Sequence, residues 1–405
     1  MLKPLVVAMA MTMAFASQTG VAANNVRYQV TDLGVGNAQV GTEWVGYWGE
    51  HIHNAGNVLA NVETQLSPGS SQYYARPSIW NGSAWLQMPE ISGRTGSTWT
   101  YWANGINDNG LVVGASQLTS SEFDDSIVGQ YQGFVWNTNT NQVTTFGAPS
   151  YGDESSAEAI NNQGLVAGVM GTSGSNLALR AMVWNNGVFS DAINPMAPYD
   201  SVATEINSHG YIAGHYYFNG QPFVFYKNHL LGSTIYNINY QNYQDQEVAD
   251  LNDQGLVAFN VDNGCNQAGC DQKGIIWNPV TGQMVTIEPT DGWTLGAEVG
   301  GLNNLGQAVG QWMERSEGAI LWDADNGIQP INTMLLPGTT YTIFGANDIN
   351  DSGVILARGA VLNTNYTEAR LLLLTPVPVP EPGTYALMLA GLGLVGWEAR
   401  RRKEQ

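Results

Sequence analysis

Charged residues are scarce in this chain of 405 residues, and cations are the scarcest. Lys and Arg together number 14 against 34 Asp and Glu, a formal net charge of −20. A nucleic-acid-binding protein needs a basic face for the phosphate backbone, so this balance argues against that class and against binding anionic lipid by charge. Gly, Trp and Tyr are plentiful at 48, 13 and 18 residues, a composition typical of a β-rich, turn-rich protein outside the cell.

Cysteine is almost absent as well. The two cysteines, Cys265 and Cys270, lie close together in "DNGCNQAGCDQ", with no histidine nearby in sequence. Two cysteines do not supply the four ligands of a structural zinc site. In an oxidising compartment such neighbours form a small disulfide. We therefore predict a disulfide between Cys265 and Cys270 that closes a polar loop.

Common signatures of catalysis are missing too. The chain holds no Gly-x-Ser-x-Gly elbow, no phosphate-binding Gly-rich loop and no His-Glu-x-x-His pair. Of the five histidines, His51 and His53 form an H-x-H pair without a third ligand, and the sequence offers no evident carboxylate partner for His209 or His215. We expect no metal, no cofactor and no enzymatic activity.

The first residues have the pattern of an export signal. In "MLKPLVVAMAMTMAFASQTGVAANN" one cation, Lys3, precedes an apolar stretch from Leu5 to Ala16, and small residues offer cleavage after Ala23 or, alternatively, after Ala16. The apolar stretch is well under the roughly 20 residues that a membrane-spanning helix needs. We therefore predict that residues 1–23 are a secretory signal peptide, with a short membrane anchor as the alternative.

One short phrase recurs along the rest of the chain. It reads "GINDNGLVVG", "AINNQGLVAG", "EINSHGYIAG", "DLNDQGLVAF", "GLNNLGQAVG" and "DINDSGVILA", preceded by a weaker copy, "HIHNAGNVLA". In each turn the glycine accepts a positive φ, and the Asn side chain can bond the neighbouring backbone. The six full copies place these turn residues at Asn107, Gly110, Asn161, Gly164, Asn207, Gly210, Asn252, Gly255, Asn303, Gly306, Asn350 and Gly353.

The spacing and the strand pattern predict the architecture. The glycines are 45 to 54 residues apart, a period found in propellers and in some helical arrays. In the third unit "AEAI" and "LVAGVM" flank one turn, while "LRAMVW" and "VFSDAI" flank a second. Four antiparallel strands per repeat are typical of a propeller blade. The second hairpin recurs with an aromatic residue at Trp80, Trp136, Phe225, Trp277 and Trp322.

The two ends of the repeat region predict how the ring closes. The seventh unit lacks a fourth strand, whereas "VRYQVTDLG", from Val26 to Gly34, is a strand with no hairpin before it. If this strand completes the last blade, no sheet edge is left open. We therefore predict an all-β fold, a seven-bladed β-propeller over residues 24–375 closed by the N-terminal strand. An open β-solenoid and a pair of β-sandwiches are the alternatives.

The repeat resembles a known bacterial family. The phrase I-N-x-x-G-x-V-x-G, followed by a small residue, an apolar pair and Trp, is similar to the extracellular repeats named HAF, as is the opening Tyr-x-Val-Thr-Asp-Leu-Gly. The His-Ala-Phe triplet itself is absent, and its equivalents read "GFVW", "AMVW", "PFVF", "GIIW" and "AILW". The resemblance covers most of residues 26–375 and implies an extracellular repeat protein with no assigned reaction.

The tail contains three elements in order. A Pro-rich linker over residues 376–383 holds a Pro-Glu-Pro motif, an apolar stretch follows, and a basic end comes last. This order resembles the PEP-CTERM protein-sorting signal. The 14 residues from Thr384 to Trp397 would give roughly 21 Å of helix, which is marginal for a hydrocarbon core of about 30 Å. The residues we assign to sorting are Pro380, Glu381, Pro382, Arg400, Arg401 and Arg402.

The resemblance implies a partner and a route. Such tails are recognised by an exosortase, an integral-membrane enzyme similar to thiol proteases, which cleaves near the Pro-Glu-Pro, often in Gram-negative bacteria that make exopolysaccharide. Over residues 384–405 we predict a short transmembrane helix with its basic end in the cytoplasm. We expect export, transient anchoring at the inner membrane, and then release to the cell surface or the medium. A permanent C-terminal anchor is the alternative.

Two patterns bear on ligands. The turns that begin at Asp250 and Asp348 approximate calcium loops, but the other copies lack Asp at that position, so we interpret them as structural turns. Aromatic rings beside Asn and Gln are suited to stacking on sugars. The segment "YNINYQNYQDQ" is too polar for a core, and its Tyr236, Tyr240 and Tyr243 are the candidate glycan-binding residues.

These observations favour a non-enzymatic, exosortase-processed binding or structural module of the extracellular polysaccharide layer, with exopolysaccharide as its expected partner. The alternative is a propeller hydrolase or lyase that acts on polysaccharide. Its carboxylates would come from loop residues such as Asp124, Asp125, Asp153 and Glu154. A purely structural surface protein is a third interpretation.

Overall fold

The computed structural model describes fifteen stretches of the chain and one residue of the tail. The described residues are 26–34, 47–65, 73–91, 99–118, 131–146, 154–171, 179–191, 201–216, 222–226, 229–233, 245–266, 269–288, 296–312, 318–362, 369–378 and 400. The predicted signal peptide, the three candidate glycan-binding tyrosines and the Pro-Glu-Pro motif lie outside these residues.

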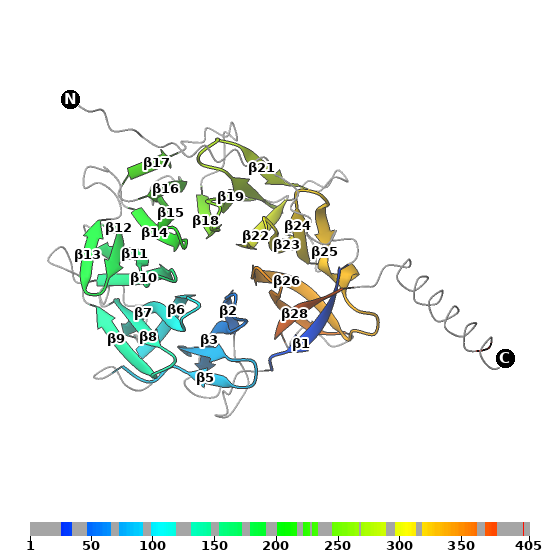
Figure 1. Ribbon diagram of the computed structural model, residues 1–405, viewed down its shortest axis with the longest axis horizontal. Coiled ribbons are helices and arrows are strands. Elements are labelled where there is room, and N and C mark those ends of the chain that lie inside the picture. The colour runs from blue at the N-terminus through cyan, green and yellow to red at the C-terminus, as the bar shows by residue number, and fades with distance from the viewer. Residues whose placement is uncertain are drawn as a thin grey trace.

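Seven antiparallel sheets of four strands surround a central axis, one repeat to a blade (Figure 1). The strands nearest the axis are β2 (Tyr47–Ile52), β6 (Trp99–Ile106), β10 (Glu154–Ile160), β14 (Ser201–Ile206), β18 (Asp245–Leu251), β22 (Ala297–Leu302) and β26 (Tyr341–Ile349). The second strands are β3 (Val58–Gln65), β7 (Leu111–Leu118), β11 (Val166–Gly171), β15 (Tyr211–Tyr216), β19 (Val257–Asn266), β23 (Ala308–Trp312) and β27 (Ile355–Val361).

The outer half of each blade is the second hairpin of the repeat. The third strands are β4 (Tyr73–Trp80), β8 (Gln132–Asn137), β12 (Arg180–Asn185), β16 (Pro222–Tyr226), β20 (Gly269–Trp277), β24 (Ala319–Asp323) and β28 (Arg370–Pro378). The outermost strands are β5 (Trp85–Gln87), β9 (Gln142–Phe146), β13 (Val188–Asp191), β17 (His229–Ser233), β21 (Met284–Ile287), β25 (Gly327–Pro330) and β1 (Val26–Asp32). The predicted all-β, seven-bladed propeller is confirmed.

The ring is closed by β1, the outermost strand of the last blade. β1 pairs antiparallel with β28, with Val26 opposite Pro378 and Asp32 opposite Leu372. This seam joins residues from the two ends of the repeat region, so the last blade has four strands like the others. The predicted closure by the N-terminal strand is therefore confirmed.

The seam strand β28 is longer than the sequence indicated. We placed the start of the linker at Pro376, whereas β28 continues to Pro378. The backbone N–H of Leu336 donates to the carbonyl oxygen of Tyr28 at 3.0 Å, on the side of β1 away from β28. Tyr28 and its partner Pro376 are therefore a non-hydrogen-bonded pair, where the missing N–H of proline costs no ladder bond.

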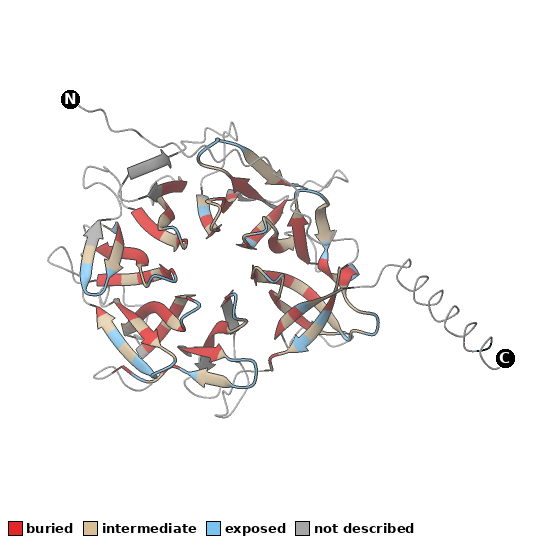
Figure 2. Ribbon diagram, viewed as in Figure 1, coloured by how far each residue is buried: buried red, intermediate tan, exposed pale blue. Residues whose placement is uncertain are grey.

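The core is divided among the interfaces between blades. Within the described residues, seven buried apolar clusters each draw side chains from two neighbouring blades. Figure 2 shows burial concentrated on the inner strands, with exposure increasing toward the outermost ones. The repeated aromatic residues serve this core, since Trp136 and Trp277 are fully buried.

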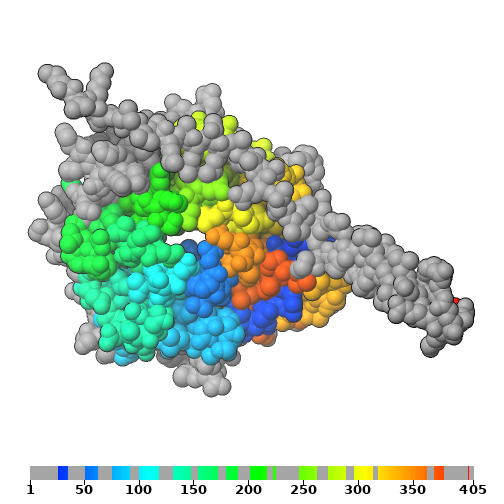
Figure 3. Space-filling view, viewed as in Figure 1, coloured from blue at the N-terminus to red at the C-terminus, as the bar shows by residue number. Residues whose placement is uncertain are grey.

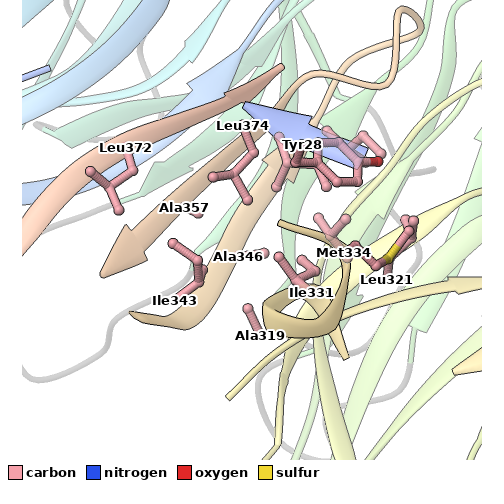
Figure 4. Close-up of a cluster of buried hydrophobic side chains, with 13 residues drawn as sticks. Tyr28, Ala319, Leu321, Ile331, Met334, Ile343, Ala346, Ala357, Leu372 and Leu374 are labelled. Atoms are coloured by element: carbon pink, nitrogen blue, oxygen red, sulfur yellow. The ribbon is translucent and has the colours of Figure 1, made fainter. Parts of the chain in front are cut away.

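One cluster holds the seam against the neighbouring blade. Tyr28 of β1 lies in one cluster with Leu372 and Leu374 of β28 and with residues of the 3-10 helix η3 (Ile331–Met334), and Figure 4 shows Leu374 nearer to Tyr28 than Leu372 is. Tyr28 is only 2% exposed. Burying an aromatic side chain of this size contributes several kcal/mol, so the N-terminal strand is a part of the core and not an appendage.

Two further predictions concern the cysteine pair and the C-terminal transmembrane helix. Cys265 and Cys270 are register partners in the β19–β20 hairpin, so the expected loop is a pair of strands, while the disulfide stays a prediction. None of the helices among the described residues is long and apolar enough to span a bilayer. The predicted transmembrane helix over residues 384–405 lies outside that part of the chain, apart from Arg400.

Candidate functional site

The repeated turns meet at one end of the central channel. Each joins the innermost strand of a blade to the second strand, and together they line a cavity of about 210 Å³. The space-filling view shows the ring hollowed at its centre (Figure 3). Among the described residues that line this cavity there is no Trp, Tyr or Phe. The aromatic stacking that we considered for sugars therefore has no platform in this part of the channel.

The predicted turn residues make the turns in the same way in each blade. The seven glycines, from Gly56 to Gly353, have φ between +74° and +84°, the left-handed region that glycine adopts most readily. In the second blade Asn107 Oδ1 accepts the backbone N–H groups of Asn109 at 3.1 Å and Leu111 at 2.9 Å. The Asn side chain thus replaces main-chain partners inside the turn.

The same asparagines also join one blade to the next, which sequence reasoning missed. The side-chain amide of each donates to the carbonyl oxygen of the equivalent residue in the following blade, at 2.9 to 3.2 Å. These bonds run from Asn107 to Asn161, then to Asn207, Asn252, Asn303 and Asn350, and from Asn350 to His53. All six asparagines are 3 to 4% exposed. We call this arrangement the asparagine ring.

His53 takes the place of Asn in the first blade and interrupts the ring. Its Nδ1 lies 3.0 Å from the backbone N of Ala55 and 3.1 Å from Oδ1 of Asp108, in the next blade. Its Nε2 is buried without a hydrogen-bond partner within the described residues. Burial lowers the pKa of His53, while the carboxylate of Asp108 acts in the opposite direction. The junction of the first two blades is the one place where the asparagine ring is not continued.

A second set of bonds lies one residue further along the turns, at five of the seven junctions between blades. Here the backbone N–H of one turn donates to the side-chain oxygen of the next, at 2.6 to 2.9 Å. The bonds run from Asp108 to Asn162, from Ser208 to Asp253, from Asp253 to Asn304, from Asn304 to Asp351 and from Asp351 to Asn54. Polar side chains at both positions of the phrase therefore fasten adjacent blades.

A β-bulge recurs near the end of every innermost strand. In β6 the register shifts between Ala103 and Gly105, so Asn104 is the extra residue. Its Nδ2 donates to the carbonyl oxygen of Ala157 at 3.0 Å and to Oε2 of Glu158 at 2.9 Å, both in the next blade. Bulges re-aim side chains in this way. The extra residues share no chemical type, so no sequence pattern indicated them: Glu50, Asn104, Glu158, Thr204, Ala249, Gly300 and Asn347.

Two carboxylates just after the bulges are used as structural acceptors. Asp250 accepts the backbone N–H of Leu251 and that of Leu302, in the next blade, both at 2.6 Å. Asp348, in the last blade, likewise accepts the backbone N–H of Ile349 at 2.7 Å and that of Ile52, in the first blade, at 2.8 Å. The aspartates that resembled the start of calcium loops therefore bind main-chain N–H groups.

Three acids near this end of the channel, Glu205, Asp250 and Glu158, have raised pKa values. Glu205 occupies the equivalent position in the fourth blade and makes no hydrogen bond within the described residues. Burial, with Asp250 as the next cause, raises its pKa well above the ordinary value. Burial and then Asp348 raise the pKa of Asp250 to about 7, against the opposing effect of its two backbone donors. Burial also raises the pKa of Glu158.

The remaining predicted residues are placed as follows. His51 lines the cavity, with Nδ1 at 3.5 Å from Oδ2 of Asp348. Across the described ranges, no three His, Cys, Asp or Glu side chains are arranged to hold a metal ion. Glu154 is buried at the start of β10, the opposite end of that strand from the turn, so it is not part of the cavity. Asp124, Asp125 and Asp153 lie outside the described residues.

The fold and the tail together define a class: a closed seven-bladed propeller with a sorting signal. Residues 378–403 match the family described as the PEP-CTERM protein-sorting motif, which confirms the resemblance inferred for the tail. This signal implies export, membrane-associated processing by an exosortase and final localisation at the surface. The resemblance of the repeats to HAF stays a prediction.

Solved structures are similar in architecture at very low identity. A catalytically inactive variant of virginiamycin B lyase from Staphylococcus aureus, with quinupristin, is 10% identical, with a TM-score of 0.49 over 86% of this chain and 100% of that one. The propeller domain of the Trilobed protease from Pyrococcus furiosus is 9% identical, with a TM-score of 0.48 over 83% of this chain and 98% of that one. No curated protein matches the chain.

Proposed function

We propose that this protein is an exported, exosortase-processed binding module, displayed at the cell surface or in the surrounding polysaccharide layer, and that it is not an enzyme. The observation that carries the proposal is the sorting motif at residues 378–403, which starts at the last residue of β28. The propeller supplies a rigid disc, and the tail supplies its route to the surface.

The bonding at the channel end supports binding or display over catalysis. A catalytic carboxylate must be free to exchange a proton with a substrate. Both oxygens of Asp250 and of Asp348 accept main-chain N–H groups, and the six asparagines are engaged within and between turns. Most polar groups of the cavity therefore form hydrogen bonds that hold the turns and the blades together.

Polysaccharide is the partner that we propose. Hydroxyl-rich chains are recognised by amide and carboxylate groups together with aromatic faces. At the channel end Glu205 offers a carboxylate without a hydrogen bond among the described residues. Tyr236, Tyr240 and Tyr243 remain the candidate stacking residues.

The experiment follows the tail in cells of a host that carries an exosortase. We expect wild-type protein to pass from the membrane fraction to the surface or the medium in a shortened form. A variant with Glu381→Ala should stay full-length in the membrane fraction. A shortened, exported wild type that also appears in cells lacking the exosortase would contradict the proposed route. Binding is then measured with the released form on a glycan array.

A polysaccharide hydrolase or lyase is the second candidate, because one observation favours it. Acids with raised pKa values in a cavity are candidates for general acid and base, and burial raises the pKa of Glu205 well above its ordinary value and that of Asp250 to about 7. The released form would then degrade a polysaccharide that it binds, and Glu205→Gln would abolish the degradation without abolishing binding. Intact polysaccharide after prolonged incubation would dismiss this candidate.

A further inference from the structure

The sorting motif begins where the seam ends. The last pair of the seam is Val26 with Pro378, and one residue, Val379, separates Pro378 from the Pro-Glu-Pro motif. A residue of extended chain spans at most about 3.5 Å, so connectivity alone keeps Pro380 within about 7 Å of the last paired residue. An enzyme that acts at this motif meets the edge of a folded blade.

The two strands of the seam are not held equally. β1 is fixed from its other side, where Arg27 Nη1 donates to the carbonyl oxygen of Thr333 at 2.7 Å and the carbonyl of Tyr28 accepts from Leu336. By contrast, the pairing of β28 with β27 stops at Leu374. Residues 375–378 of β28 are therefore paired with β1 alone.

The ladder at this end is short. Because Tyr28 directs its carbonyl away from β28, the hydrogen-bonded pairs with β28 are its neighbours, Arg27 with Val377 and Gln29 with Thr375. Opening these pairs releases residues 375–378 while Leu372 and Leu374 stay in the core. Local opening of so small a unit needs much less free energy than unfolding of the propeller.

We propose that the pairing of β1 with the end of β28 gates the processing of the tail. Enzymes that capture peptides in extended form pair with the main chain of the captured segment, and main-chain groups paired with β1 are not available to them. Cleavage near the motif therefore proceeds from the state in which residues 375–378 have left β1. The cleavage is a net hydrolysis: water supplies a hydroxyl to the new carboxyl end and a proton to the departing amine.

The gate rests on the proposed function, because it requires the tail to be an exosortase substrate. A disulfide across the seam tests it. Gln29 and Thr375 are exposed and directly opposite each other, so Gln29→Cys with Thr375→Cys places the two Cα atoms at a distance suited to a disulfide. In pulse-labelled cells that carry the exosortase, we expect this lock to slow the appearance of the shortened form about tenfold or more, and a reductant to restore it.

Matched controls separate the gate from a general effect of cross-linking. Asn185→Cys with Val188→Cys joins another exposed, opposite pair, in the β12–β13 hairpin. This pair and the single-cysteine variants should be processed at the wild-type rate. A short Gly/Ser spacer inserted after Pro378 leaves the seam paired and moves the motif away from it, so it should speed processing and remove the effect of the lock.

The outcomes are distinct. If the locked protein is exported, folded and processed at the wild-type rate, the gate is wrong while the sorting route stands. A spacer that does not relieve the lock would also overturn the gate. If wild-type protein is never shortened in these cells, the proposed sorting route fails, and the gate fails with it.

Discussion

The side-chain amide of Asn252 donates to the carbonyl oxygen of Asn303 at 3.0 Å, across 51 residues of sequence and one interface between blades. Oδ1 of Asn252 also accepts the N–H groups of Gln254 and Leu256. One buried side chain thus forms its own turn and fastens the next blade. The ring depends on six such residues, which makes the turn Asn the most informative position for mutation.

The first prediction concerns this double role. Asn252→Ala removes three bonds and leaves buried partners unsatisfied, so we expect the free energy of unfolding to fall by about 3 kcal/mol. Asn278 is the matched control: it caps a turn through Val280 and Thr281, and no bond from it to another blade is found within the described residues. Asn278→Ala should cost about 1 kcal/mol. Equal losses in denaturant titrations would contradict a fastening role for Asn252.

The second prediction separates backbone strain from steric overlap. Gly306 has φ +76° and no atom close to where a Cβ would be, so Gly306→Ala should cost only the left-handed conformation, about 1 kcal/mol. A Cβ at Gly110 would lie 2.6 Å from Oγ1 of Thr138, whose hydroxyl bonds the Gly110 carbonyl. Gly110→Ala should therefore cost about 2 kcal/mol or more. Thermal melts of the two variants test this order.

The third prediction is a pH dependence opposite to ordinary acid denaturation. The pKa of Asp250 is about 7 in the folded protein and near 4 when unfolded, so the folded state binds the proton more tightly. Between about pH 4 and 7 the unfolded state carries fewer protons, and stability falls as pH rises. Glu205 contributes with the same sign. Burial lowers the pKa of His53, and this acts in the opposite sense below its ordinary pKa of 6.5.

The variant Glu205→Gln isolates this effect because it mimics the protonated acid. It should melt at the wild-type temperature near pH 4 and above it at pH 8. Asp325→Asn, at an exposed acid outside the cavity, is the control and should show no such trend. A constant difference between Glu205→Gln and wild type at all pH values would show that the carboxylates do not repel one another.

The fourth prediction concerns the seam. Tyr28→Ala should lower the free energy of unfolding by about 3–5 kcal/mol, because a buried aromatic side chain is lost from the core. Tyr28→Phe should be nearly neutral at pH 7. Burial, with Asp323 as a second cause, raises the pKa of Tyr28 to about 12, so wild type loses stability between about pH 10 and 12 as the unfolded tyrosine ionises. The Phe variant should retain that part; a parallel loss would rule out Tyr28 as its source.

The fifth prediction is the disulfide. Cys265 and Cys270 are opposite each other in a hairpin, and directly opposite residues have Cα separations within the range of disulfides. Protein isolated from the medium should contain no free thiol and should gain two on reduction. Titration with a thiol reagent before and after reduction measures this. Two reactive thiols in the unreduced, unfolded protein would refute the pairing.

Much of the fold could be predicted because short sequence motifs specify each blade. The Asn-Gly turns fixed the number of blades, and the unpaired strand from Val26 fixed the closure. The site was less accessible to sequence reasoning. The reach of Asn107 to Asn161 is a contact between blades, and the bulge residues, such as Asn104 and Glu158, share no type that a pattern would reveal. Both features exist only once the sheets stand side by side.

The end of β28 was missed for a related reason. Proline usually argues against a strand, and Pro376 and Pro378 led us to begin a linker too early. Their pairing is tolerated because both fall at non-hydrogen-bonded positions opposite β1. Which residues of β28 form hydrogen-bonded pairs with β1 depends on which side of β1 faces η3, and this cannot be inferred from composition.

The two prolines also determine which backbone hydrogen-bond donors the end of β28 presents to other chains. Past Leu374 the flank that β27 leaves open would ordinarily present amide protons to any passing extended peptide. Pro376 and Pro378 have none to give on that flank. A second chain therefore cannot extend the seam blade by accepting backbone hydrogen bonds from residues 376 and 378 along this flank.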